Sequence, residues 1–118
     1  MDKKPTALVV EDDAVQRALI CTLMEDCNFH VVDFESAEAA EAAIDHLGDA
    51  VRMIFIDINL AGVMTGAEFA FLAKDKFPNA KIVVSSGGRA PPLPANTLYM
   101  QKPWRALDVL QVARQAFH

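Results

Sequence analysis

Polar residues that could act together on a phosphoryl group follow several short apolar runs of this sequence. They are the acidic run Glu11-Asp12-Asp13, the single Asp57, the pair Ser85-Ser86 and Lys102. Converging carboxylates repel one another unless a cation neutralises them, and oxygen ligands without a nearby His or Cys favour Mg²⁺ over Zn²⁺. An ammonium group and a hydroxyl would then suit a dianionic group beside the metal. The residue types therefore predict a phosphoryl site.

Taken singly, most of these residues have an ordinary structural explanation. Asp13 is placed to cap a helix, Lys102 would be a solvated surface charge, and Ser86 a turn residue before two glycines. Asp57 is harder to explain in this way, because it directly follows the apolar run 53–56 and precedes another apolar residue. The prediction rests on the combination of residue types at four expected strand ends.

The segments that must position these residues alternate between β-rich apolar runs and stretches of helical period. Strands are expected at 7–10, 30–34, 53–57, 81–85 and 98–100. Helices are expected at 14–27, from a cap at Ser36 to a stop at Gly48, at 67–77 and at 105–116. The apolar positions that recur at helical spacing are Val15, Leu19 and Leu23 in the first helix, and Leu107 and Leu110 with Val112 or Ala113 facing inward in the last.

This alternation implies βαβ units with right-handed crossovers, and therefore a parallel sheet covered by helices on both faces. We expect one doubly wound α/β domain over residues 1–118. Ligands of such sheets bind beyond the carboxyl ends of the strands, where the polar residues lie. Residues 87–97 interrupt the pattern with two Gly and three Pro. The fourth helix is therefore expected to be missing or vestigial, replaced by a Pro/Gly-rich loop.

Composition and charge limit the classes of partner. The chain has 11 basic and 16 acidic residues, a net charge of −5, and no cluster of Lys and Arg, so neither nucleic acid nor an anionic membrane is expected as a direct partner. No apolar run is long enough for a signal peptide or a membrane span, which predicts a cytoplasmic location. The spacing of Cys21 and Cys27 on one expected helix predicts free thiols.

Four segments together resemble the receiver domains of two-component response regulators, along essentially the whole chain. They are residues 8–13 (LVVEDD), 55–58 (FIDI), 84–87 (VSSG) and 99–103 (YMQKP). The resemblance implies a flavodoxin-like fold with a five-stranded parallel sheet in the order 2-1-3-4-5. It also implies a switch rather than an enzyme: the domain accepts a phosphoryl group from a histidine kinase or histidine phosphotransfer protein and signals by binding an unknown protein partner.

The resemblance also implies roles for individual residues. Asp57 is the phosphoacceptor, assisted by Lys102 and Ser86. The implied Mg²⁺ ligands are Asp12 and Asp57 through their side chains, Asn59 through its backbone carbonyl and Glu11 through a water. Ser86 and Tyr99 are the implied switch pair, and the peptide bond before Pro103 is usually cis in this family.

Three features depart from the usual pattern of the family. Ala61 stands where Pro is common, and Gly66 comes one residue later than usual. A second serine, Ser85, precedes the switch position, which we assign to Ser86 because a small residue follows it. The Pro-rich segment 87–97 replaces a helix that many receivers use for output or dimerisation.

Other functions fit the sequence less well. A phosphate sink in a phosphorelay belongs to the same class, whereas a small Mg²⁺-dependent aspartyl phosphohydrolase would need a substrate cap and a second acid where Asn59 stands. A flavin-binding module would need a Ser/Thr/Gly-rich loop after the first strand, where this chain has three acidic residues. A purely structural role would suit a degenerate site, but every chemical position is filled. Because the last expected helix ends at the C-terminus, we expect a stand-alone regulator without an output domain.

Overall fold

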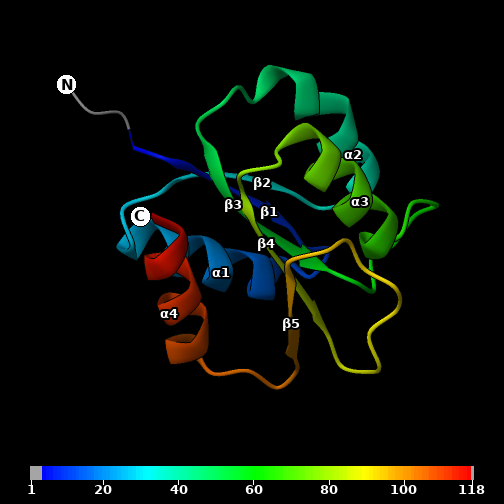
Figure 1. The fold of residues 1–118 in the computed structure, drawn as a ribbon. Helices are drawn as coiled ribbons and strands as arrows, with labels where there is room; N and C mark the ends of the chain where they lie inside the picture. Colours follow the sequence, from blue (N-terminus) through cyan, green and yellow to red (C-terminus); the bar gives the residue numbers. More distant parts are fainter. Residues whose placement is uncertain (1–3, 118) are drawn as a thin grey trace.

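The apolar runs of the sequence form a five-stranded sheet in the computed structural model, which describes residues 4–117 (Figure 1). All neighbouring strands are parallel, in the order β2-β1-β3-β4-β5, which confirms the expected doubly wound fold. The strands are β1 (Thr6–Val10), β2 (His30–Phe34), β3 (Val51–Asp57), β4 (Lys81–Ser86) and β5 (Thr97–Gln101). The helices are α1 (Ala14–Asp26), α2 (Ala37–Ala43), η1 (Ile44–His46, a 3₁₀ turn), α3 (Gly66–Lys76) and α4 (Ala106–Phe117).

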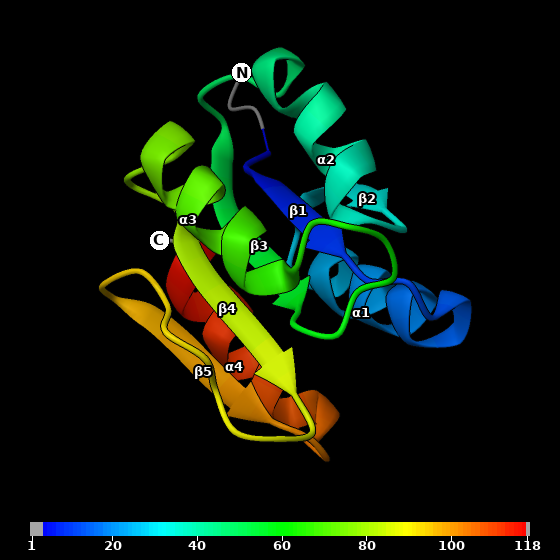
Figure 2. The ribbon, with the colours of Figure 1, turned by 90° about the vertical axis from the view of Figure 1, so that its right-hand side faces the viewer.

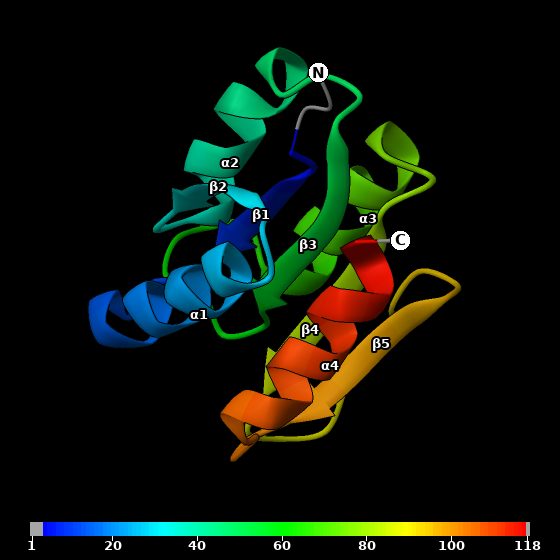
Figure 3. The ribbon, with the colours of Figure 1, turned by 90° about the vertical axis from the view of Figure 1, so that its left-hand side faces the viewer.

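Helices cover both faces of the sheet and create two separate apolar clusters (Figures 2 and 3). Alternate strand residues point to opposite faces, so Leu8 and Val10 of β1 pack with α2 and α3, whereas Ala7 and Val9 pack with α1 and α4. The central strands are therefore buried on both faces, as their continuous apolar runs predicted.

Side-chain caps fix where three helices begin. Asp13 accepts a hydrogen bond from the Gln16 amide at 2.8 Å, and Ser36 accepts one from the Ala39 amide at 3.1 Å, as predicted for both caps. Thr65 and Glu68 form a reciprocal capping box at the start of α3. Each cap lies just after the carboxyl end of a strand or its loop, which places the helix starts close to the polar residues of interest.

Three apolar positions at helical spacing are exposed, and one of them, Leu107, was predicted to face inward. Val15 and Leu19 are 82% and 45% exposed, because α1 buries Ile20, Leu23 and Met24 instead. Leu107 is 46% exposed because α4 buries Val109, Val112 and Ala113, and two residues along a helix turn the side chain to the opposite face. The prediction that Leu107 faces inward was therefore wrong, whereas the inward positions predicted at Val112 and Ala113 are confirmed.

The expected loss of the fourth helix is confirmed. Residues 87–96, all described, connect β4 to β5 without a helix (yellow in Figure 2). Pro94 is buried, and Leu93 packs against the cluster formed by α2, α3 and the sheet. The Pro-rich loop thus shields part of the sheet face that a helix would otherwise cover.

Candidate phosphoryl and magnesium site

The carboxyl ends of four strands bring the predicted chemical residues to one edge of the sheet. Asp57 ends β3 and pairs in register with Ser85 of β4, while Ser86 pairs with the last residue of β5, directly before Lys102. Glu11 follows β1, the neighbour of β3. Carboxylate oxygens of Glu11, Asp12 and Asp57 all lie within 4.8 Å of one another.

Asp57 is held at the centre of this edge. Its side chain is buried, with 4% of the residue exposed. The Asn59 amide donates to its Oδ1 at 3.2 Å, and Lys102 Nζ lies 3.5 Å from its Oδ2. The Lys102 amide in turn donates to the Ser86 carbonyl at 2.8 Å, and the Lys102–Pro103 peptide bond is cis, the form that the resemblance implied.

Glu11 is a buried carboxyl group beside the carboxyl groups of Asp12 and Asp57. It is 1% exposed, its Oε2 accepts from the Asp13 amide at 3.1 Å, and its Oε1 is buried without a hydrogen-bond partner. Burial above all, followed by the neighbouring Asp57 and Asp12 side chains, raises the pKa of the Glu11 carboxyl to about 8. An orphaned buried oxygen beside two further carboxylates is an arrangement that a cation would relieve.

The donor set fits Mg²⁺. Every candidate ligand is an oxygen atom, and Mg²⁺ is usually held by one or two carboxylates with waters completing its shell. Asp12, which is exposed, and the buried Asp57 would hold the ion directly. Glu11 would act through water, and Asn59 lies in the loop directly after Asp57 with its backbone against that carboxylate.

The two adjacent serines have different surroundings. Ser86 Oγ accepts a hydrogen bond from the Gly88 amide at 3.1 Å and lies 3.5 Å from the Asn59 side-chain nitrogen, on the side of the acidic residues. Ser85 Oγ instead accepts from Trp104 Nε1 at 2.9 Å, in the cluster beneath α1 and α4. The structure therefore places Ser86, the predicted residue, and not Ser85 at the site.

The Tyr99 and Ser86 side chains both form hydrogen bonds with the backbone of Gly88. The Tyr99 hydroxyl donates to the Gly88 carbonyl, while the Gly88 amide donates to Ser86. Both residues expected to act as a switch therefore contact the first turn of the Pro-rich loop.

Gly66 permits a close approach that no other residue would allow. A Cβ atom at this position would lie 2.2 Å from the Asp57 carbonyl and 2.8 Å from the Ile58 Cα. The Gly66 amide also donates to the Ile58 carbonyl at 3.3 Å. The first turn of α3 thus packs directly on the end of β3, even though the loop between them is one residue longer than the family usually has.

Sequence reasoning missed three residues that support this edge. Arg17 Nη1 donates to the Glu11 carbonyl at 2.8 Å, Trp104 binds Ser85, and Glu38 accepts hydrogen bonds from Val63 and Met64 in the loop after Asp57. The two loop amides lower the pKa of the Glu38 carboxyl. These contacts depend on how neighbouring elements meet in the fold, so no local sequence pattern reveals them.

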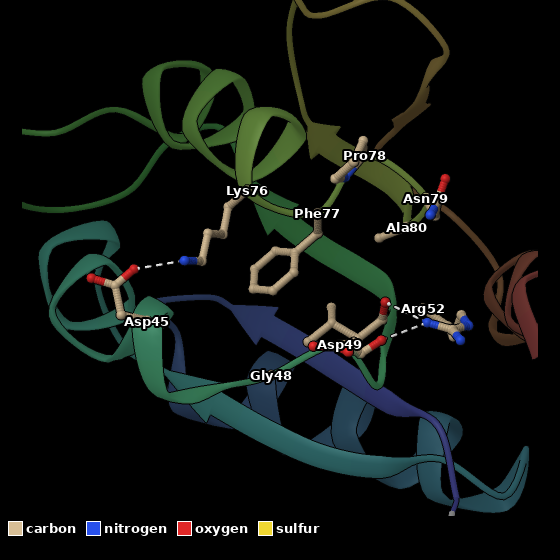
Figure 4. Close-up of a pocket in the computed structure, with 10 residues that line it drawn as sticks. Asp45, Gly48, Asp49, Arg52, Lys76, Phe77, Pro78, Asn79 and Ala80 are labelled. Atoms are coloured by element: carbon tan, nitrogen blue, oxygen red, sulfur yellow. Dashed lines mark hydrogen bonds and ion pairs between the residues drawn. The ribbon is translucent and has the colours of Figure 1, made fainter.

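A separate hollow of about 450 Å³ lies at the opposite edge of the sheet (Figure 4). It is lined by the Asp45–Lys76 ion pair, at 2.9 Å, and by Phe77 and Arg52 near the start of β3. Lys76 lowers the pKa of Asp45, so these charges are already compensated. This hollow is remote from the residues that converge on Asp57.

Comparison with known proteins identifies the architecture. Residues 7–105 match the response regulator receiver domain family. The chain belongs to this family. Members act in two-component signalling, with phosphorylation and Mg²⁺ binding typical of the family, and they interact with histidine kinases or phosphotransfer proteins. Comparison with curated proteins gave no match.

Several solved receiver structures are similar to this one over nearly their whole length. A receiver protein from Sinorhizobium medicae has a TM-score of 0.86 at 22% identity, covering 98% of this chain and 95% of that one. Chemotaxis response regulator CheY4 of Vibrio cholerae has a TM-score of 0.79 at 19% identity, covering 97% and 99%. The receiver domain of NtrX from Brucella abortus has a TM-score of 0.76 at 26% identity, covering 94% and 97%.

Within residues 4–117, none of the helices is both long and apolar enough to cross a membrane.

Proposed function

We propose that this receiver works as a stand-alone, cytoplasmic regulator that accepts a phosphoryl group on Asp57 from a histidine kinase or phosphotransfer protein. It then signals through phosphorylation-dependent binding of a partner protein, without nucleic-acid contact and without catalytic turnover of a substrate. The observation that carries the proposal is the buried Asp57 carboxylate, held between Lys102 and an acidic group that contains an unpartnered Glu11 oxygen.

The residues around Asp57 suit in-line transfer. An Asp57 carboxylate oxygen forms the new O–P bond, and the N–P bond of the phosphohistidine breaks with its electron pair returning to the donor imidazole. Lys102, already 3.5 Å from Asp57 Oδ2, provides positive charge for the transferred oxygens. Mg²⁺, when bound, supplies further charge stabilisation. Asp57 needs no general base, because it attacks as the carboxylate.

Exposed apolar side chains near this edge support docking of a protein donor. Val15, in the first turn of α1, is 82% exposed, and Val63, in the loop after Asp57, is 92% exposed. Asp57 is buried, so a phosphohistidine can reach it only if the donor protein contacts the surrounding surface. Apolar groups left in water there would gain free energy from such a contact.

The route to an output partner begins at Ser86. A phosphoryl oxygen at Asp57 would offer the Ser86 hydroxyl a new acceptor, and Ser86 and Tyr99 both hold the backbone of Gly88. A shift of either side chain would therefore change the position of the backbone in residues 87–97. Arg89 and Pro92 of this loop are exposed. This loop takes the place in the signalling surface that a fourth helix would occupy.

Labelling with a small phosphodonor and Mg²⁺ tests the proposal. The wild-type protein should take up one phosphoryl group, and Asp57→Asn should take up none, because its amide cannot attack phosphorus. Equal labelling of both proteins would refute the assignment. Sustained hydrolysis of a phosphomonoester would instead indicate a phosphohydrolase, and labelling that alters no partner binding would leave a phosphate sink.

A further inference from the structure

The loop that follows Asp57 is held by hydrogen bonds at its two ends and is exposed in its middle. At its start, the Ile58 amide donates to the Ser85 carbonyl at 2.9 Å, and at its end the capping box of α3 fixes Thr65. Between these points the chain is exposed at 61–63. The middle of the loop therefore needs an anchor of its own if Asn59 is to keep a fixed position.

Glu38 of α2 provides that anchor. Its Oε2 accepts hydrogen bonds from the Val63 amide at 2.7 Å and the Met64 amide at 3.1 Å. The carboxylate also lies against the backbone of Gly62, since a Cβ atom there would fall 2.8 Å from both Glu38 oxygens. Gly62 adopts a φ of +106°, which a residue with a side chain rarely adopts. Backbone and carboxylate are thus closely fitted to each other.

The anchor is attached to a firmly packed helix. Ala37 and Ala40, on either side of Glu38, have no exposed surface and pack into the cluster between α2, α3 and the sheet. Ser36 caps the same helix. Figure 2 shows the loop (green) passing from the end of β3 to the base of α2. A contact to Glu38 therefore links the exposed part of the loop to the core.

We propose that Glu38 is a positioning residue for the Mg²⁺ and phosphorylation site, acting through residues 59–64. Its carboxylate holds Val63 and Met64 and so limits the positions open to Asn59, whose amide contacts Asp57 and whose side chain contacts Ser86. This inference rests on the proposed function of Asp57. As an acidic residue in the first turn of α2, Glu38 also has a local role in stabilising its own helix.

The decisive variant is Glu38→Asp, which keeps the negative charge at the start of α2 but shortens the side chain by one methylene. Glu38→Gln is the complementary variant, because it keeps the length and one acceptor oxygen but loses the charge. Glu41→Asp is the matched control. Glu41 lies on the same helix, is exposed, and makes no side-chain hydrogen bond or ion pair with any described residue.

Three measurements separate positioning from general stability: amide hydrogen exchange of Val63 and Met64 without Mg²⁺, Mg²⁺ affinity from the shift of the Asn59 amide, and thermal unfolding. For Glu38→Asp we expect hydrogen exchange at the two loop amides to be about tenfold faster. The shorter side chain no longer holds these amides, so a local opening of the loop is enough to expose them. We expect Mg²⁺ affinity about tenfold weaker, as for loss of an outer-shell partner. The unfolding temperature should fall no further than in Glu41→Asp.

Phosphorylation provides a further distinction. With Glu38→Asp, the Mg²⁺ concentration for half-maximal labelling of Asp57 should rise about tenfold, while the rate at saturating Mg²⁺ should approach that of wild type. Glu38→Gln should lie between wild type and Glu38→Asp, because it retains an acceptor. A lower rate at saturation with an unchanged Mg²⁺ requirement would overturn the proposal.

Unchanged loop exchange in Glu38→Asp, or faster exchange with unchanged Mg²⁺ affinity, would also overturn the positioning role. Wild-type protein that binds Mg²⁺ and is labelled, beside a Glu38→Asp variant indistinguishable from it, would refute the role of Glu38 alone. Wild-type protein that neither binds Mg²⁺ nor is labelled would refute the proposed function, and with it any positioning role for this site.

Discussion

The indole Nε1 of Trp104 donates a 2.9 Å hydrogen bond to the hydroxyl of Ser85. This bond ties the segment after the cis proline to β4, beside an edge-to-face contact of Trp104 with Phe55. It also explains why two adjacent serines serve different purposes. The Ser85 hydroxyl is bound to Trp104 in the core on one face of the sheet. Ser86, on the other side, is therefore the serine available to the site.

Alanine substitutions should separate the two serines. Ser85→Ala leaves the Trp104 N–H without its partner and should destabilise the protein by about 1–3 kcal/mol in urea unfolding, with labelling of Asp57 retained. Ser86→Ala should keep more of its stability, because Gly88, whose amide loses its partner, is an exposed residue. The Ser86→Ala variant should also lose the phosphorylation-dependent change in the NMR chemical shift of the Gly88 amide. The reverse pattern would contradict the assignment of Ser86.

Lys102 should matter for phosphoryl transfer because it is the cation beside Asp57. In Lys102→Met, labelling by a small phosphodonor should slow by about 100-fold, the loss typical when one donor that stabilises charge in a transition state is removed. Lys76→Met is the control, because Lys76 pairs with Asp45 at the opposite edge of the sheet. Similar rates for the two variants would show that Lys102 has no part in transfer.

Gly66 should tolerate no side chain. In Gly66→Ala the new Cβ would lie 2.2 Å from the Asp57 carbonyl, so the end of β3 or the start of α3 must move. We expect a loss of about 1–3 kcal/mol in urea unfolding and weaker labelling of Asp57. Gly88→Ala is the matched control, because nothing lies within 4 Å of its Cβ and its φ is outside the left-handed region. Equal stability of both variants would be inconsistent with this packing.

The sequence was sufficient to predict the sheet because its strands are buried on both faces and appear as continuous apolar runs, as in residues 7–10 and 53–56. The site followed, since parallel strands bring their carboxyl ends to one edge. Asp57 and Lys102 could therefore be placed together although they are 45 residues apart.

The parts that could not be predicted depend on which surfaces meet. Leu107 lies in an apolar stretch, but only the packed structure shows that α4 turns Val109 toward the sheet instead. Glu38 had a complete local explanation as a first-turn acid, which concealed its contact with Val63, 25 residues away. Local periodicity constrains the type of an element more strongly than its rotation or its partners.

Cys21 should be an unreactive thiol near neutral pH. Burial, and to a lesser extent the nearby Asp33 and Glu25, disfavour the thiolate and raise the pKa of Cys21 to about 11 from the usual 9.0. Between these pH values the unfolded chain has lost a proton that the folded protein keeps, so the free energy of unfolding should fall as pH rises through this window.

Alkylation measures the same property. In Cys27→Ser, which isolates Cys21, the rate of reaction with iodoacetamide should keep rising up to about pH 11, because only the thiolate reacts. In denaturant the same rate should level off near pH 9. A native rate that also levels off near pH 9 would contradict the predicted shift.

Asp12 and Asp13 provide a matched pair for the metal site. Mg²⁺ that binds only the folded protein should raise the unfolding temperature of wild type. Asp12→Asn should lose most of that rise, because one of the three clustered carboxylates becomes a neutral amide. Asp13→Asn removes the same charge one residue away but should keep the rise. Asp13 is committed to the Gln16 amide, and Asn caps helices as well as Asp does. If both variants lost the rise equally, Mg²⁺ would be responding to the general negative charge of this edge and not to Asp12 as a ligand.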